Sequence, residues 1–141
     1  MKKINNIMKR ILSFIIAFAI VLMAIGFTGC NIRVSSYRAL MLVQTNTKHE
    51  ASMSFSKFTG TKVFTLKVVG NKEMMLSYSA ELDNGKAEVF YEYNGEKTDL
   101  FTIEPGEEKK SIIGPFSSGT IYITVKTMET CDEGKFVFSL N

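Results

Sequence analysis

Few residues of this 141-residue chain have the types and spacing that catalysis or metal binding requires. The single histidine, His49, stands between Lys48 and Glu50 in a predicted turn, where a solvated side chain is favoured over a ligand or a base. No pair of cysteines or histidines has the spacing of a zinc site. Two predicted loops hold acids, but without the alternation of a dedicated calcium loop: Glu104, Glu107 and Glu108, then Asp132 and Glu133. The sequence therefore predicts no catalytic residue, no metal and no cofactor.

The cysteine with the most informative surroundings is Cys30, which ends the stretch Gly26-Phe27-Thr28-Gly29-Cys30. An apolar run precedes it, from Ile11 to Ile25, interrupted only by Ser13. Met1–Arg10 holds four basic residues and no acid, which suits a segment kept on the cytoplasmic side of a membrane. In this order the three parts resemble a bacterial lipoprotein signal peptide that ends in a lipobox.

This resemblance implies cleavage between Gly29 and Cys30 and a diacylglyceryl group on the Cys30 sulfur, with a further acyl chain on the new N-terminus in some bacteria. Phe27 and Thr28 depart from the Leu and the Ala or Ser that the family prefers, which bears on the efficiency of processing. An uncleaved anchor would need about 20 apolar residues, and Ile11–Phe27 is at the lower edge of that range. Plain secretion would favour an Ala-x-Ala site, and the residues directly before Cys30 do not form one. The expected location is the extracytoplasmic face of the cell membrane, where acyl chains such as palmitate hold the protein.

The charge of the chain is concentrated in the predicted signal peptide. Lys and Arg number 17 against 14 Asp and Glu, a net charge of +3, and four of those bases lie within Met1–Arg10. Without them the remaining chain carries one more acid than base, so it lacks the basic surface expected of a nucleic-acid-binding protein.

Three segments follow from this division: residues 1–29 as signal peptide, 30–36 as lipidated cysteine and short tether, and 37–141 as one domain. About 110 residues suffice for a single hydrophobic core. Cys131 is left without a disulfide partner if Cys30 is lipidated. Because Asp132 and Glu133 disfavour a thiolate, we expect an inert thiol there.

The predicted domain is built from short runs with period-two alternation, which is typical of half-buried strands. These runs are 51–58, 62–69, 73–82, 86–93, 96–103, 111–113, 120–128 and 135–140. Asn84-Gly85 and Asn94-Gly95 both predict two-residue hairpins, and Glu104–Lys110 predicts an exposed loop. Tyr37–Val43 is a strand buried on both faces or a short helix, with strand favoured. The fold class is therefore all-β, an antiparallel, jelly-roll-like β-sandwich of about eight strands after a helical signal peptide.

The closing stretch, from Gly114-Pro115-Phe116 through Thr120–Ile123 to Phe136-Val137-Phe138, resembles the ends of jelly-roll-like modules appended to secreted bacterial proteins. Such modules often bind carbohydrate or assist a neighbouring domain, and that is what the resemblance implies here.

Aromatic residues are the remaining candidates for binding. Tyr78, Tyr91, Tyr93 and Tyr122 have the flat body and polar tip of a sugar-stacking side chain. Alternation puts three of the four on the core face, which favours packing. It points Phe90 outward between two acids, where Met75 and Val69 would complete an exposed partner patch. The alternative is a buried position for Phe90 within a second contact layer.

Two function classes survive these observations. One is a binding or accessory module for a glycan or an envelope protein, held at the membrane through Cys30. The other is a small extracytoplasmic enzyme, disfavoured because the chain lacks paired inward acids and histidine clusters for acid–base chemistry. A structural envelope protein is a third interpretation that the sequence does not separate from the first.

Overall fold

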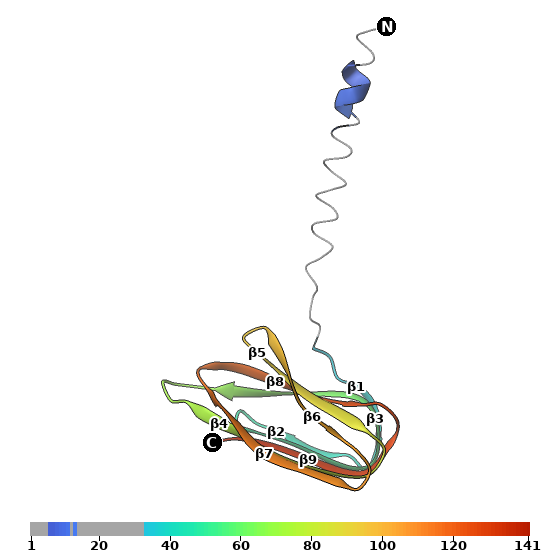
Figure 1. The fold of residues 1–141 in the computed structure, drawn as a ribbon, viewed down its shortest axis with the longest axis vertical. Coiled ribbons are helices and arrows are strands. Elements are labelled where there is room, and N and C mark those ends of the chain that lie inside the picture. The colour runs from blue at the N-terminus through green and yellow to red at the C-terminus, as the bar shows by residue number, and fades with distance from the viewer. Residues whose placement is uncertain (1–5, 12, 14–32) are drawn as a thin grey trace. The chain divides into compact units, whose positions relative to one another are not determined.

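The computed structural model describes residues 6–11, 13 and 33–141 (Figure 1). Residues 6–11 and 13 are helical. The predicted cleavage and lipidation sites, Gly29 and Cys30, lie outside the described residues. Within the described residues, no helix has both the length and the apolar character needed to cross a bilayer. A separate compact unit, Arg33–Asn141, contains every strand found among the described residues.

Nine strands follow one another within Arg33–Asn141, which confirms the predicted all-β class. They are β1 (Ser36–Leu40), β2 (Val43–Asn46), β3 (Glu50–Val68), β4 (Met74–Asn84), β5 (Ala87–Tyr93), β6 (Glu96–Ile103), β7 (Glu107–Phe116), β8 (Gly119–Thr127) and β9 (Cys131–Leu140).

The strands form long antiparallel ribbons, each bent in its middle. β8 and then β9 pair along a single edge of β3, with Lys126 opposite Thr61 and Cys131 opposite Phe58. On their other edges, β8 pairs with β5 and β9 pairs with β4. β5 then pairs with β6, and β4 pairs with β7. On its other edge β3 pairs with β1 and β2. The sheet is therefore about five ribbons wide and folded across its middle.

Folding gives two layers around one core. We call layer A the group of β6, β5, β8 and the second half of β3, residues 61–68. Layer B comprises β2, the first half of β3, residues 50–58, β9, β4 and β7. Figure 1 places β5 and β8 at one side of the domain and β2, β7 and β9 at the other. This arrangement is a jelly-roll-like sandwich, as the alternation predicted.

The fold line needs backbone that ordinary residues avoid. Gly60 and Gly85 have φ of +127° and +92° where β3 and the β4–β5 ribbon bend. A Cβ on Gly85 would lie 2.7 Å from the Cys131 Cα, and one on Gly60 would meet the Ser36 carbonyl oxygen. Both corners therefore require glycine for conformation and for space.

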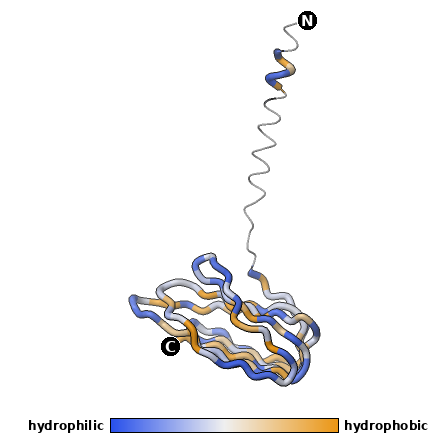
Figure 2. Tube along the Cα trace, in the orientation of Figure 1, coloured by the Kyte–Doolittle hydropathy of each residue, from blue (hydrophilic) through white to orange (hydrophobic). Residues whose placement is uncertain are grey.

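The core lies between the layers and contains most of the residues that alternation places inward, together with others such as Phe58, Phe116 and Cys131. Alternating positions of β3, β4, β5, β8 and β9 are buried, and hydrophobic and hydrophilic residues alternate along the strands (Figure 2). Its largest fully buried side chains include Phe58, Phe64, Phe136 and Phe138. Burial of one such ring contributes about 1.5 to 3 kcal/mol.

One predicted hairpin is wrong. Asn94-Gly95 joins β5 to β6 as expected, with Tyr93 opposite Glu96. Asn84-Gly85 instead turns the chain from layer B into layer A, since β4 pairs with β7 and β9 while β5 pairs with β6 and β8. A bend in a long strand and a tight hairpin both need positive φ, so the same dipeptide serves either.

Two further predictions need correction. The expected loop Glu104–Lys110 is mostly strand, because β7 begins at Glu107 and continues through Gly114-Pro115 to Phe116. The run Tyr37–Val43 is neither helix nor a strand buried on both faces. It contributes to β1 and β2, two short edge strands with mostly exposed side chains, separated near Met41, whose φ is +51°. Pairing with β3 determines this position, and local composition does not reveal it.

Candidate functional site

The candidate site is a pair of adjoining hollows on the outer face of layer B. The larger has a volume of about 480 Å³ and the smaller about 170 Å³. They share Glu81 and Lys135 as lining residues, so together they form one groove across β3, β9, β4 and β7. We call this the layer B groove.

Strand alternation fills the groove with polar side chains. In β3, Met53 and Phe55 are buried, so Ser52, Ser54 and Ser56 point to the outer face. In β4 the buried Ala80 and Leu82 alternate with outward Ser79, Glu81 and Asp83. The register then aligns these outward positions into rows across the sheet.

Charged residues occupy the middle of the groove. Lys135 of β9 is opposite Ser54 on one side and Glu81 on the other, and Glu81 is opposite Glu108 of β7. Like charges directly opposite each other in a sheet are destabilising. Lys135 offsets this repulsion from the other side of Glu81. The row Ser54, Lys135, Glu81, Glu108 therefore presents hydrogen-bond donors and acceptors of both charges to solvent.

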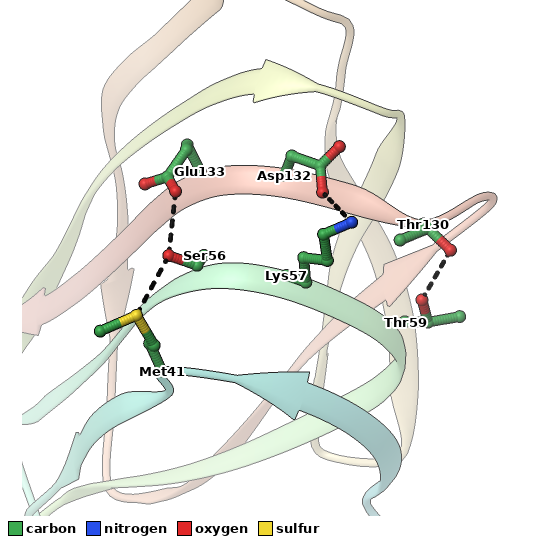
Figure 3. A network of polar contacts seen from close by, with 7 residues as sticks. All are labelled: Met41, Ser56, Lys57, Thr59, Thr130, Asp132 and Glu133. Carbon is green, nitrogen blue, oxygen red and sulfur yellow. Dashed lines mark hydrogen bonds and ion pairs between the residues drawn. The ribbon is translucent and has the colours of Figure 1, made fainter.

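A second row lies closer to the fold line. The Ser56 hydroxyl donates a hydrogen bond of 2.9 Å to the Glu133 carboxylate (Figure 3). Asp83 also lines the hollow there. Farther along the same strands, Lys57 pairs with Asp132 at 3.8 Å and Thr59 donates a hydrogen bond to Thr130. These contacts tie β3 to β9 and fix the position of Glu133, whose φ is +46°.

One end of the groove is apolar. Met41, with 82% of its surface exposed, lines the larger hollow, and the Ser56 hydroxyl lies 3.7 Å from its sulfur. Gly134 lines the floor, and a Cβ there would meet the Phe55 ring. The groove thus combines polar rows with an apolar wall at Met41.

Of the three residues of the predicted partner patch, Val69 and Met75 flank the connection between β3 and β4, whereas Phe90 is on β5. Phe90 is half-buried on β5 in layer A, where the Lys97 ammonium lies 3.9 Å from its ring centroid. Met75 lies at an irregularity in the β4–β7 pairing of layer B, and Val69 follows β3. Cation–π contact with Lys97 explains how an outward aromatic is covered at this position.

The tyrosines take different roles. Tyr78, Tyr91 and Tyr93 pack against the core, as predicted. Tyr122 lies on the outer face of layer A beneath Arg33, whose guanidinium carbon is 4.1 Å from the ring centroid. Arg33 also donates two hydrogen bonds to one Glu92 carboxylate oxygen, at 2.9 and 3.2 Å. We call this arrangement the Arg33 clamp.

The reactive atoms of His49 and Cys131, the Nε2 nitrogen and the thiol sulfur, are both buried. The Nε2 atom of His49 is buried without a hydrogen-bond partner, so the predicted solvated side chain is wrong. The His49 carbonyl accepts a hydrogen bond from the Leu140 amide, which holds the residue against β9. Cys131 is fully buried, and this burial raises its thiol pKa to about 11. Such a thiol is protonated at neutral pH.

The acids considered as calcium ligands are dispersed or already bonded. Glu107 accepts a hydrogen bond of 2.9 Å from the Glu104 amide and pairs with Lys109, and these contacts lower its pKa. Among residues 6–11, 13 and 33–141, no three of His, Cys, Asp and Glu gather closely enough to hold a metal ion.

Sequence reasoning did not identify the groove as a site. Three of the predicted runs, 51–58, 73–82 and 135–140, contribute to it, and their neighbours in space are set by long-range register. Glu108 stood in a predicted loop. The outward serines of 51–58 and the outward acids of 73–82 were the available signal, because each run showed which face would be polar.

No family model matches this chain, and a search of curated proteins finds no match. Solved structures with a similar fold include TmCBM61 in complex with β-1,4-galactotriose, at 14% identity and a TM-score of 0.42, covering 79% of this chain and 83% of that one. A mutant of a family 29 carbohydrate-binding module has 15% identity and a TM-score of 0.39, covering 77% and 74%. The pre-peptidase C-terminal domain of a collagenase from Bacillus anthracis has 12% identity and a TM-score of 0.42, covering 69% and 91%.

Proposed function

We propose that this protein is a lipoprotein of the extracytoplasmic membrane face whose domain binds a glycan in the layer B groove. The lipid would be carried by Cys30, as the resemblance of residues 1–30 to a lipoprotein signal peptide implies. The observation that supports glycan binding most directly is the groove itself, with its rows of hydroxyl, carboxylate and ammonium groups beside an apolar wall.

The chemistry of the groove suits a polyhydroxylated ligand. Sugar hydroxyls donate to carboxylates and accept from ammonium groups, and charge-assisted hydrogen bonds of this kind are about twice as strong as neutral ones. Glu81, Asp83 and Lys135 supply these groups, while Met41 offers an apolar surface to the face of a sugar ring. Because the residues stand on paired strands, the spacing of their backbone positions is fixed before the ligand arrives.

Binding is favoured over catalysis at this site. Glu81 and Glu108 are register partners on neighbouring strands, and a pair of carboxylates is also what glycoside hydrolysis uses. Both side chains are exposed, however, so neither is held in the dry environment that would keep one of them protonated as a general acid.

The proposal is tested by calorimetric titration of the purified protein with a panel of neutral and amino-sugar oligosaccharides. Glu81→Gln and Asp83→Asn should each weaken binding by about tenfold or more, since a hydrogen bond to a charged group contributes about 1.5 to 3 kcal/mol. Both side chains are exposed, so the melting temperature should stay nearly unchanged.

Glu96→Gln is the matched control, because Glu96 is an exposed acid at the β5–β6 hairpin of layer A. Equal weakening by Glu96→Gln and Glu81→Gln would contradict a site in the groove. Failure of all the oligosaccharides, together with capture of an envelope protein that Glu81→Gln abolishes, would replace the glycan by a protein ligand. Cleavage of an oligosaccharide that is lost in Glu108→Gln would favour the enzyme.

A further inference from the structure

The outer edge formed by β1 and β2, the strands that pair with one side of β3, carries exposed apolar side chains. Among the described strands, β1 and β2 pair with β3 alone, so their outer edge carries unpaired backbone groups. Apolar side chains along this edge are exposed: Val34 (57%), Leu40 (59%), Met41 (82%) and Val43 (68%). An exposed apolar edge of this kind invites association with another surface.

Charge along the same segment has a single sign. From Asn31 to His49 the sequence contains Arg33, Arg38 and Lys48 and no acidic residue. Arg33 is neutralised by Glu92, and Lys48 lies beyond the end of β2. Between Val34 and Asn46 the one charged residue is Arg38, which is exposed. Exposed apolar side chains beside a cation, with no acid among them, suit a segment that lies in the interface of an anionic bilayer.

The distance to the predicted anchor is short. The Arg33 clamp fastens the first described residue of the domain onto Tyr122 and Glu92. Only Asn31 and Ile32 separate it from Cys30, and three residue steps span at most about 11 Å. A lipid on Cys30 would therefore hold the beginning of this edge within reach of the bilayer surface.

We infer that the β1–β2 edge, from Val34 to Asn46, is a second contact of this protein with an anionic lipid bilayer. This inference rests on the proposed lipid anchor at Cys30 and adds an orientation to it. The contact is at headgroup depth, because the unpaired backbone groups of the edge need hydrogen-bond partners that the hydrocarbon does not offer. With one end of the groove at Met41, the groove would open beside the membrane surface.

The absence of tryptophan from the chain allows a direct test. The full-length protein is produced in bacteria as Leu40→Trp and placed in phosphatidylcholine–phosphatidylglycerol vesicles that contain a lipid with a nitroxide on its headgroup. The matched control is Ile112→Trp, since Ile112 is 63% exposed on β7 at the opposite edge of the sheet. Quenching at position 40 should exceed that at position 112 by about threefold or more, as expected for interfacial residence.

A second pair of variants tests the charge. Arg38→Glu in the Leu40→Trp protein should reduce quenching on anionic vesicles, whereas Lys110→Glu, an exposed change on β7, should leave it unchanged. Equal quenching at positions 40 and 112 overturns the inference. The mass of the Cys30 peptide is measured on the same samples: an unacylated Cys30 contradicts the anchor, and the quenching comparison still decides whether the edge contacts the bilayer.

Discussion

At the scale of single residues, the one cysteine of the domain is buried, whereas the charged residues of the layer B groove are exposed. Cys131 is enclosed in the core, and its sulfur approaches the Lys86 and Glu129 carbonyl oxygens at 3.6 and 3.5 Å. Glu81, Asp83 and Lys135 are displayed on the outer face of layer B instead. The Cys131 thiol is thus kept from solvent. The side chains that a ligand can reach are carboxylate and ammonium groups, which suit reversible hydrogen bonding.

The raised pKa of Cys131 predicts a loss of stability at high pH. The folded protein holds the thiol proton up to about pH 11, whereas the unfolded chain releases it near pH 9. Below pH 9 the stabilisation is fully present, and between pH 9 and 11 the free energy of unfolding should fall by about 2 to 3 kcal/mol.

Urea unfolding of wild type and Cys131→Ala from pH 8 up to pH 11, the pKa of the folded thiol, isolates this effect. Other groups titrate equally in both proteins, so the difference between their pH profiles reports Cys131 alone. Parallel profiles would contradict the buried neutral thiol. Native Cys131 should also react with a thiol reagent at pH 8 far more slowly than it does in urea.

At the scale of elements, bent strands explain the architecture. β3 runs for 19 residues through both layers, and β4–β5, β6–β7 and β8–β9 bend beside it. The bend near Gly85 brings the backbone against Cys131, whereas Gly95 forms an open hairpin tip. Two glycines with similar φ therefore differ in how much space surrounds them.

This difference predicts unequal costs for the same substitution. Gly95→Ala should destabilise the domain by about 1 to 2 kcal/mol, because only the left-handed backbone is strained. Gly85→Ala adds a clash with the Cys131 backbone and should cost several kcal/mol in total. Thermal or urea unfolding of both variants measures the comparison, and equal destabilisation would argue against a closed corner at Gly85.

Alternation along single runs was sufficient to predict the fold class and most of the core. Met53, Phe64 and Phe138 are buried as expected because each local pattern determines which side faces inward. The partner of each run could not be obtained in the same way. Asn84-Gly85 gives positive φ to a hairpin or to a bend, and Glu108 meets Glu81 only through pairing between residues far apart in sequence. The groove could therefore not be predicted from local sequence patterns.

At the scale of the whole molecule, the proposed account joins a lipid anchor, a short clamped connection and a groove that opens beside the membrane. The Arg33 clamp would limit rotation of the domain on its anchor, because Arg33 is bound to Glu92 and stacked on Tyr122. Such an arrangement would present the groove to ligands at the cell surface in a narrow range of orientations.

The central claim, attachment through Cys30, is tested most directly by metabolic labelling with a fatty acid in cells that produce wild type or Cys30→Ser. Two acyl chains suffice for stable anchoring, at about 0.8 kcal/mol per buried CH₂. Wild type should carry the label and fractionate with membranes, and Cys30→Ser should carry none and remain unprocessed. Cys131→Ser is the control and should be labelled like wild type. Label on the Cys30→Ser protein equal to that on wild type would contradict the account.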